Sequence, residues 1–124
     1  MKMNSVVIRT DNMEKSLAFY EKIIGLTFES MISAAPGKRI AFLYDAQSGN
    51  RLEIIQNERF KQKPVHSMSL TFIVDQIGET EKYLQSKGVP IIMMPRTVKD
   101  GKKMLTATDP NGVEIDFIEL KRAQ

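Results

Sequence analysis

Two carboxylates and two hydroxyls recur at matched positions in the two halves of the sequence. Ser69 lies 64 positions after Ser5, and Asp116 lies 63 positions after Glu53. A carboxylate beside a bound carbonyl compound serves as a general base, and a pair of carboxylates holds a hydrated Mg²⁺ or Mn²⁺ weakly. Glu53 and Asp116 are therefore the candidate catalytic residues. Acid–base or metal chemistry, ligand binding, and structural pairing with Ser5, Ser69 or a nearby arginine such as Arg9 are the roles open to them.

Several other kinds of chemical site are excluded by the residue types present. The chain has no cysteine, which rules out disulfides and thiolate ligands and fits a reducing cytoplasm. Neither a Gly-rich phosphate loop nor a zinc-ligand spacing is present. The one histidine, His66, lies three residues before Ser69, and an odd offset along a strand places it on the opposite face. We expect His66 at the surface or the rim of a site, unless a β-bulge re-aims it.

The two halves share an order of elements that would position these residues. Segments 5–11 and 69–75 each contain a small polar residue, a strand-like run and an aspartate, and a helical pattern follows. Each half predicts a strand, a helix and three further strands. The expected bounds in the first half are a strand at 5–10, a helix from an N-cap at Asp11 or Asn12 to Gly25, and strands at 27–33, 39–45 and 51–56. Those in the second half are a strand at 69–74, a helix from about 77 to 87, and strands at 91–94, 103–108 and 113–120.

Alternation along these strands assigns their side chains to a helix-covered face and an open face. The expected core residues are Val6, Ile8, Leu52, Ile54, Leu70, Phe72, Val74, Ile115 and Phe117. The candidate ligand-binding residues are Ser5, Val7, Arg9, Phe42, Tyr44, Arg51, Ser69, Thr71, Met93 and Glu114. Phe42 and Tyr44 share one face of their strand, and alternation leaves open which face that is. Most of Met31, Met68, Met93, Met94 and Met104 are expected in the core, although by alternation Met93 or Met94 must lie on the open face.

The composition is that of a folded globular protein. With 124 residues, 42% of them hydrophobic and 27% charged, the chain is expected to form a single domain, 1–124, made of two modules, 1–58 and 65–120. No apolar run is long enough to predict a membrane span. The net charge of +3 is spread over a linker, a turn and the C-terminal tail, so we expect no nucleic-acid partner.

Five segments, in order and with internal doubling, resemble the vicinal oxygen chelate superfamily of glyoxalase I, bleomycin-resistance proteins and extradiol dioxygenases. They are 6–25, which includes MEKSLAFY, then LEII at 52–55, FIVD at 72–75, KGVPI at 87–91 and DPNGVEID at 109–116. The resemblance implies an α+β fold in which two βαβββ modules form a cup-shaped mixed sheet around a small-molecule site. It also implies a homodimer, because members of the superfamily commonly pair.

The resemblance further implies where a metal ion would bind. Enzymes of the superfamily hold a divalent ion with one residue from the first and one from the last strand of each module, and these positions fall on Ser5, Glu53, Ser69 and Asp116. A serine hydroxyl is a poor ligand for a first-row divalent ion, and aspartate is one methylene shorter than glutamate. We therefore expect no tightly bound metal, at most a weakly held divalent ion, and no other cofactor.

Three functional hypotheses follow from the resemblance and these departures from it. The first is a glyoxalase/bleomycin-resistance-like protein that binds a small organic molecule in the cup, without a tightly bound metal. The alternative is a metal-dependent lyase or isomerase similar to glyoxalase I (lactoylglutathione lyase), with Glu53 and Asp116 around a weakly held ion. The third is an interaction module that assembles through its sheet edges.

Overall fold

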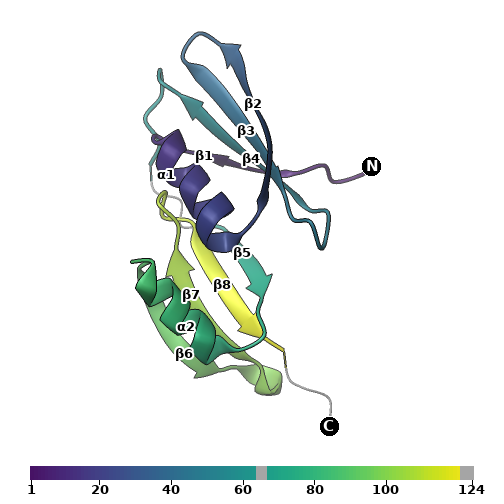
Figure 1. Ribbon diagram of the computed structural model, residues 1–124, viewed down its shortest axis with the longest axis vertical. Helices are drawn as coiled ribbons and strands as arrows, with labels where there is room; N and C mark the ends of the chain where they lie inside the picture. Colours follow the sequence, from purple (N-terminus) through teal and green to yellow (C-terminus); the bar gives the residue numbers. More distant parts are fainter. Residues whose placement is uncertain (64–66, 121–124) are drawn as a thin grey trace. The chain divides into compact units, whose positions relative to one another are not determined.

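The computed structural model describes residues 1–63 and 67–120, which leaves His66 outside the described residues. The chain divides into two compact units, Met1–Lys63 and Pro64–Gln124, hereafter unit 1 and unit 2 (Figure 1). Each unit holds a four-stranded mixed sheet and a helical segment in the order strand, helix, three strands. This confirms the predicted α+β fold of two βαβββ modules. The prediction that both modules form one domain stays a prediction.

Unit 1 contains β1 (Val6–Arg9), α1 (Met13–Ala18), a π-helix η1 (Phe19–Ile24), β2 (Thr27–Ala35), β3 (Lys38–Tyr44) and β4 (Arg51–Asn57). The strand order is β1-β4-β3-β2, with β1 parallel to β4 and the other pairs antiparallel. Asn12 is the N-cap, since its side chain accepts a hydrogen bond from the Lys15 amide at 3.0 Å. Gly25 ends the helical segment with a φ of 94°, a conformation that disfavours a side chain.

Unit 2 contains β5 (Ser69–Ile73), α2 (Ile77–Ser86), β6 (Ile91–Thr97), a short 3-10 turn η2 (Lys99–Gly101), β7 (Lys103–Thr108) and β8 (Glu114–Glu119). Its strand order, β5-β8-β7-β6, repeats that of unit 1, again with the first and last strands parallel. Strand β6 continues to Thr97, past the predicted end at Met94. Pro95 does not interrupt it, because β6 is an edge strand and proline is tolerated where no ladder partner needs its amide.

In each unit the helix covers one face of the sheet, and the core of that unit lies between its helix and its sheet (Figure 1). The predicted alternation is confirmed on both central strands: Leu52 and Ile54 of β4 are buried, as are Ile115 and Phe117 of β8. From the helices, Met13 and Tyr20 fill the core of unit 1, and Ile77 and Leu84 fill that of unit 2. Burial of each such side chain contributes about 1.5–3 kcal/mol.

The prediction that most of the five methionines lie in the core is wrong, although one of Met93 and Met94 is expected on the open face. Met31, Met93 and Met94 are 36%, 48% and 58% exposed, because they lie on β2 and β6, each of which is an edge strand of its sheet. Both edge strands are also irregular, with register shifts at Phe28/Ser30 and Ser33/Ala35 in β2, and at Ile91/Met93 and Met93/Arg96 in β6. An edge strand has no neighbour on one side, so hydrophobicity alone does not bury its side chains.

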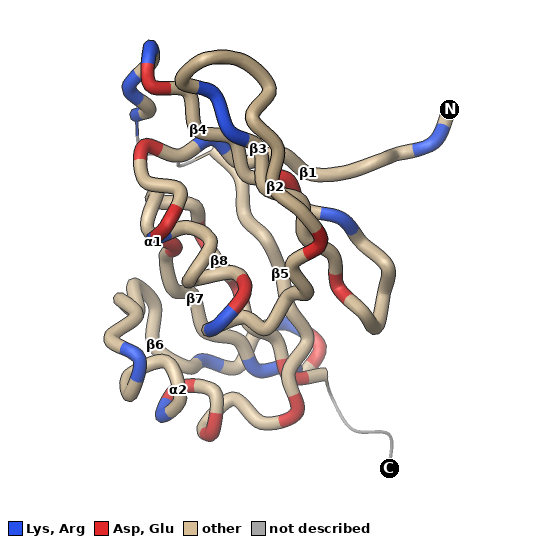
Figure 2. Tube along the Cα trace, turned by 45° about the horizontal axis from the view of Figure 1, so that its top comes forward, with Lys and Arg blue, Asp and Glu red and all other residues tan. Residues whose placement is uncertain are grey.

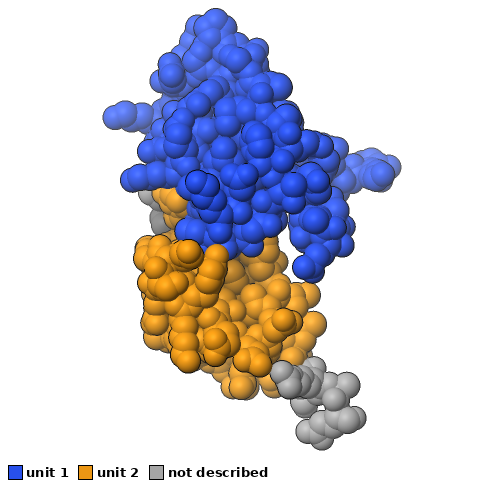
Figure 3. All heavy atoms as spheres, viewed as in Figure 1, with its two compact units in different colours: residues 1–63 blue, residues 64–124 orange. Residues whose placement is uncertain are grey.

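Charged residues of both signs are interspersed along both units (Figure 2). Figure 3 colours the atoms of unit 1 blue and those of unit 2 orange. None of the helices in the described part of the chain combines the length and hydrophobicity needed to cross a lipid bilayer.

Candidate functional site

The open face of unit 1, defined as the face of its sheet away from α1, carries the first candidate carboxylate. Glu53 lies between the buried residues Leu52 and Ile54 and is itself half-buried. Its Oε2 accepts a hydrogen bond from the Ser5 hydroxyl at 2.5 Å. The structure therefore brings together the two candidate residues of the first module. The Glu53 carboxylate is therefore hydrogen-bonded directly to a neutral donor.

In the described chain, the arginines of this face do not pair with Glu53. Arg51 forms an ion pair with Glu29 of β2. Arg9 is exposed, and among the described residues neither arginine forms an ion pair with Glu53. Serine, and not arginine, is thus the partner that the structure gives to Glu53.

Phe42 and Tyr44 lie on the same face as Glu53, which settles the question that alternation leaves open. Phe42 of β3 is the cross-strand partner of Glu53, and Glu53 pairs on its other side with Val7. Tyr44 is the partner of Arg51 in the same way. Because cross-strand partners point to the same face, Val7, Phe42 and Tyr44 form a half-buried apolar surface around the carboxylate.

The open face of unit 2, away from α2, carries the second carboxylate with a different partner. Thr71, Asp116, Thr106 and Met93 form one cross-strand row from β5 to β6. The Thr106 hydroxyl donates to Oδ1 of Asp116 at 2.6 Å, and Thr106 is only 2% exposed. Ser69, the counterpart of Ser5, instead donates to Oε2 of Glu114 at 3.4 Å. The expected pairing of Asp116 with a hydroxyl is present, but the hydroxyl comes from β7 and not from Ser69.

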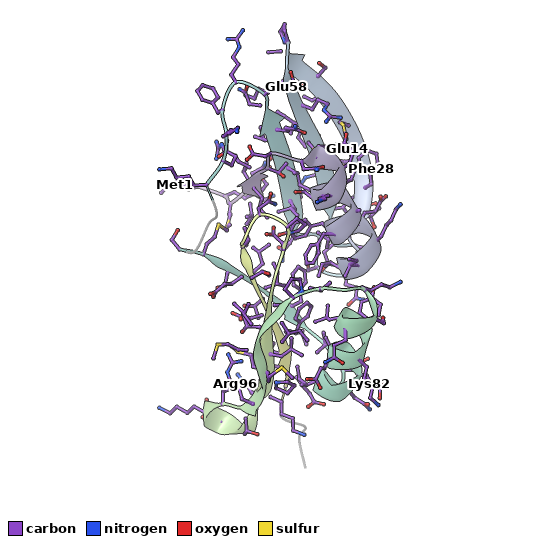
Figure 4. The ribbon with its side chains drawn as sticks, turned by 90° about the vertical axis from the view of Figure 1, so that its left-hand side faces the viewer. Met1, Glu14, Phe28, Glu58, Lys82 and Arg96 are labelled. Atoms are coloured by element: carbon purple, nitrogen blue, oxygen red, sulfur yellow. The ribbon has the colours of Figure 1, made fainter. Side chains whose placement is uncertain are left out.

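Arg96 is a residue of this face that sequence reasoning missed. It lies opposite Met104 across the β6–β7 ladder, and its Nη2 donates to Oγ1 of Thr106 at 3.4 Å. Its Nη1 is buried and has no hydrogen-bond partner within residues 1–63 and 67–120. Figure 4 shows Arg96 on the side of the sheet opposite the helix that carries Lys82. Regular alternation would place Arg96, three residues after Met93, on the other face from Met93. The register shift between Met93 and Arg96 brings it to the open face, and no signal in the sequence indicates that shift.

Comparison with known proteins gives the family. A protein-family sequence model, described as the Glyoxalase/Bleomycin resistance protein/Dioxygenase superfamily, matches residues 2–117. The chain belongs to this superfamily. A search of curated proteins found no match.

Solved structures of the superfamily share the fold of this chain. A glyoxalase family protein from Enterococcus faecalis is 23% identical, with a TM-score of 0.79 over 95% of this chain and 97% of that one. A superfamily member from Sphaerobacter thermophilus is 20% identical, with a TM-score of 0.79 over 97% of this chain and 98% of the other. A glyoxalase I mutant from Zea mays is 21% identical, with a TM-score of 0.82 over 99% of this chain but 45% of the maize chain. At these identities the likeness shows the fold alone.

The described residues of this superfamily member contain no group of three or more histidines, cysteines, aspartates or glutamates close enough to hold a metal ion. In unit 1 the donor set is one carboxylate and the hydroxyl of Ser5 that already donates to it. In unit 2 it is one carboxylate and the hydroxyl of Thr106. Each set is chemically suited to accept or donate hydrogen bonds, and is weak by the standards of a first-row metal site, which requires imidazole, thiolate or several carboxylates.

Proposed function

We propose that this superfamily member binds a small organic molecule on its open sheet faces, without a tightly bound metal ion and without catalysing a reaction. The observation that carries the proposal is the state of the two candidate carboxylates. Glu53 and Asp116 each accept a short hydrogen bond from a neighbouring hydroxyl of their own unit, at 2.5 and 2.6 Å. A metal ion at either carboxylate would compete with that hydroxyl for the same oxygen.

The composition of the open faces supports a ligand-binding role. Small-molecule sites combine apolar and aromatic side chains with a few polar groups that fix orientation. Unit 1 provides Phe42 and Tyr44 beside the Ser5–Glu53 pair. Unit 2 provides Met93 beside the Thr106–Asp116 pair, and a methionine adapts its shape to different apolar ligands.

Two measurements on the purified protein test the proposal. Elemental analysis by mass spectrometry is expected to find far less than one metal ion per chain. Thermal unfolding is expected to shift upwards with an amphipathic aromatic probe, 1-anilinonaphthalene-8-sulfonate, or with metal-free bleomycin, and not with Mg²⁺, Mn²⁺, Ni²⁺ or Zn²⁺, since only a ligand of the folded state raises the midpoint. Phe42→Ala should reduce the shift caused by the probe, and Phe60→Ala, at an exposed position outside the sheet, is its control.

The opposite outcome would identify the alternative function. Stoichiometric metal, together with turnover of the hemithioacetal of methylglyoxal and glutathione in the presence of Ni²⁺, Zn²⁺ or Mn²⁺, would show a lyase of the glyoxalase type. Loss of that turnover in Glu53→Gln would assign Glu53 to it. Absence of turnover with all three ions is the result expected here.

We also propose a homodimer in the cytoplasm. Exposed apolar side chains on the edge strands support assembly: Met31 and Ile32 on β2, and Met93 and Met94 on β6. The absence of cysteine supports a reducing compartment. Expression with a fluorescent tag, followed by fractionation, tests the compartment, and a secreted or membrane-associated pool would contradict it.

A further inference from the structure

The guanidinium of Arg96 is partly buried, and one of its two terminal nitrogens has no hydrogen-bond acceptor in the described chain. Its Nη1 is buried and lacks a hydrogen-bond partner among the described residues. Arg96 takes part in no ion pair within residues 1–63 and 67–120, so no carboxylate there lies within 4.0 Å of it. A guanidinium stays charged at all relevant pH values, and leaving one of its donors buried and unpaired costs free energy. An acceptor oxygen on a bound ligand would supply the hydrogen bond that Nη1 lacks.

The other end of the guanidinium is held in place. Nη2 donates to Oγ1 of Thr106 at 3.4 Å, and the single hydroxyl hydrogen of Thr106 is given to Asp116 at 2.6 Å. Since Thr106 has only one hydrogen to donate, it acts as the acceptor from Arg96 and the donor to Asp116. This chain of hydrogen bonds orients Arg96, and Nη1 remains without an acceptor among the described residues.

An apolar strip adjoins the guanidinium on the same face. The cross-strand partners of Arg96 and its neighbours run Arg96, Met104, Ile118 and Ile73 from β6 to β5. Ile73 is 69% exposed, whereas Met104 and Ile118 are half-buried. A ligand on this strip would place an apolar chain on Met104, Ile118 and Ile73, and a charged head group at Arg96.

We propose that the open face of unit 2 binds an amphipathic organic anion, with the carboxylate or phosphoryl oxygen of its head group on Arg96 and its apolar part along Met104, Ile118 and Ile73. This inference rests on the proposed ligand-binding function and names its ligand class. An oxyanion matches the planar fork of a guanidinium, which binds carboxylate and phosphate oxygens with two parallel donors. The apolar strip explains why an organic anion fits and an inorganic ion lacks most of the contact area.

The test compares four probes that share an eight-carbon chain and differ in head group. Octanoate, octyl phosphate, 1-octanol and octylammonium are titrated below their micelle concentrations, with binding followed by ¹H–¹⁵N chemical shifts. At least one of the two anions is expected to bind ten-fold or more tightly than 1-octanol, and octylammonium less tightly than 1-octanol. A ten-fold preference between octanoate and octyl phosphate identifies the head group as carboxylate or phosphoryl.

Three variants assign the effect to Arg96. Arg96→Gln should reduce the affinity for the anion to that for 1-octanol, and Arg96→Lys should retain part of it, because it keeps the charge and loses the fork. Arg59→Gln makes the same charge change at an exposed position in unit 1 and should leave anion affinity unchanged. Asp116→Asn should strengthen anion binding, since it removes a negative charge one hydrogen bond beyond Thr106.

Several outcomes would overturn the inference. Anions that bind no more tightly than 1-octanol, or an Arg96→Gln variant that keeps full affinity while folded by circular dichroism, would do so. A purely structural Arg96–Thr106–Asp116 chain would also overturn it. In that case Arg96→Gln and Asp116→Asn lower the thermal midpoint non-additively, and neither variant changes binding. If metal-free bleomycin binds but octanoate and octyl phosphate do not, the inference fails and the proposed function stands. If stoichiometric metal is found while Arg96-dependent anion binding persists, the proposed metal-free function fails and the inference about Arg96 stands.

Discussion

At the scale of single residues, the two modules treat equivalent carboxylates differently. The cross-strand partner on the third strand of the module is Phe42 for Glu53 and Thr106 for Asp116. Phenylalanine has no hydroxyl, so Glu53 takes its hydrogen bond from Ser5, whereas Asp116 takes one from Thr106. The repeat in the sequence locates both carboxylates but carries no information about which neighbour holds each of them.

The buried hydroxyl of Thr106 gives a first prediction. Thr106→Val keeps the shape of the side chain and removes the donor to Asp116 and the acceptor for Arg96. We expect the free energy of unfolding to fall by about 1–3 kcal/mol, because two polar partners lose a hydrogen bond. Urea denaturation measures the change. Thr71→Val, at an exposed position in the same cross-strand row, is the matched control and should change stability by less than about 0.5 kcal/mol.

Asp45, in the turn between β3 and β4, gives a prediction on pH. Hydrogen bonds from the Ser48 hydroxyl and from the Gln47 amide hold the pKa of Asp45 below its ordinary value. A carboxylate with a lowered folded-state pKa stabilises the protein above its unfolded pKa, about 3.9 for aspartate. That contribution is lost as the pH falls through the folded pKa.

The pKa of Asp45 can be followed by NMR titration of its carboxyl carbon. Ser48→Ala should move the pKa of Asp45 upwards, towards the ordinary value, because it removes the larger of the stabilising hydrogen bonds. An unchanged titration in Ser48→Ala would show that the turn does not hold the carboxylate in solution.

At the scale of elements, the start of α1 is tied to the sheet by one side chain. Oε1 of Gln56, on β4, accepts from the Met13 amide at 2.9 Å and from Nη2 of Arg39 at 3.0 Å. Nε2 of Gln56 donates to the Asp11 carbonyl at 3.1 Å. One glutamine therefore satisfies an unpaired amide of the first helical turn and fixes where the helix begins.

Replacement of this glutamine gives the prediction at this scale. Gln56→Leu leaves the Met13 amide without its acceptor, and we expect a loss of about 1–3 kcal/mol in the free energy of unfolding. Amide hydrogen exchange should also accelerate in the first turn of α1. Gln85→Leu makes the same change at an exposed position of α2, and equal losses in both variants would refute the role given to Gln56.

Most of the elements could be predicted from the sequence, and the misses have physical causes. Asn12 and Gly25 carry local signals for the two ends of the first helix, and both ends were predicted correctly within the alternatives. The conversion of α1 into a π-helix after Ala18 was not predicted, because apolar spacing does not distinguish a slightly wider turn. The predicted end of β6 at Met94 is too early, since the strand continues to Thr97. Alternation could not have placed Arg96 on the open face in any case, because the register shift after Met93 turns it there.

At the scale of the whole molecule, duplication predicts the architecture better than it predicts the site. Both units have the same strand order, and the offset locates Glu53 and Asp116 on equivalent strands. The charges around them have diverged, since Arg51 is paired with Glu29 in unit 1 whereas Arg96 in unit 2 keeps a buried donor without a partner in the described chain. The fold depends on a pattern of hydrophobic and polar residues that tolerates substitution. A binding site depends on a few particular residues, and the pattern does not specify which they are.

The proposed homodimer gives the prediction at this scale. Light scattering after size-exclusion chromatography should give about twice the chain mass of 14.1 kDa. Met31→Glu and Met94→Glu should shift the population to monomer, because each places a charge among exposed apolar side chains of an edge strand. Lys63→Glu, an exposed change in the linker, is the control. A monomer at all concentrations of the unmodified chain would rule out the dimer.

The register shifts in β2 and β6 have a consequence for how copies of the chain avoid one another. A regular edge strand with exposed methionine and isoleucine would be a template on which further chains could add strand by strand into a fibre. Each of these edges is interrupted twice, so a second chain cannot continue the backbone ladder along its length. The irregular edges thus protect a concentrated solution from open-ended growth, while their side chains stay accessible to a partner of defined shape.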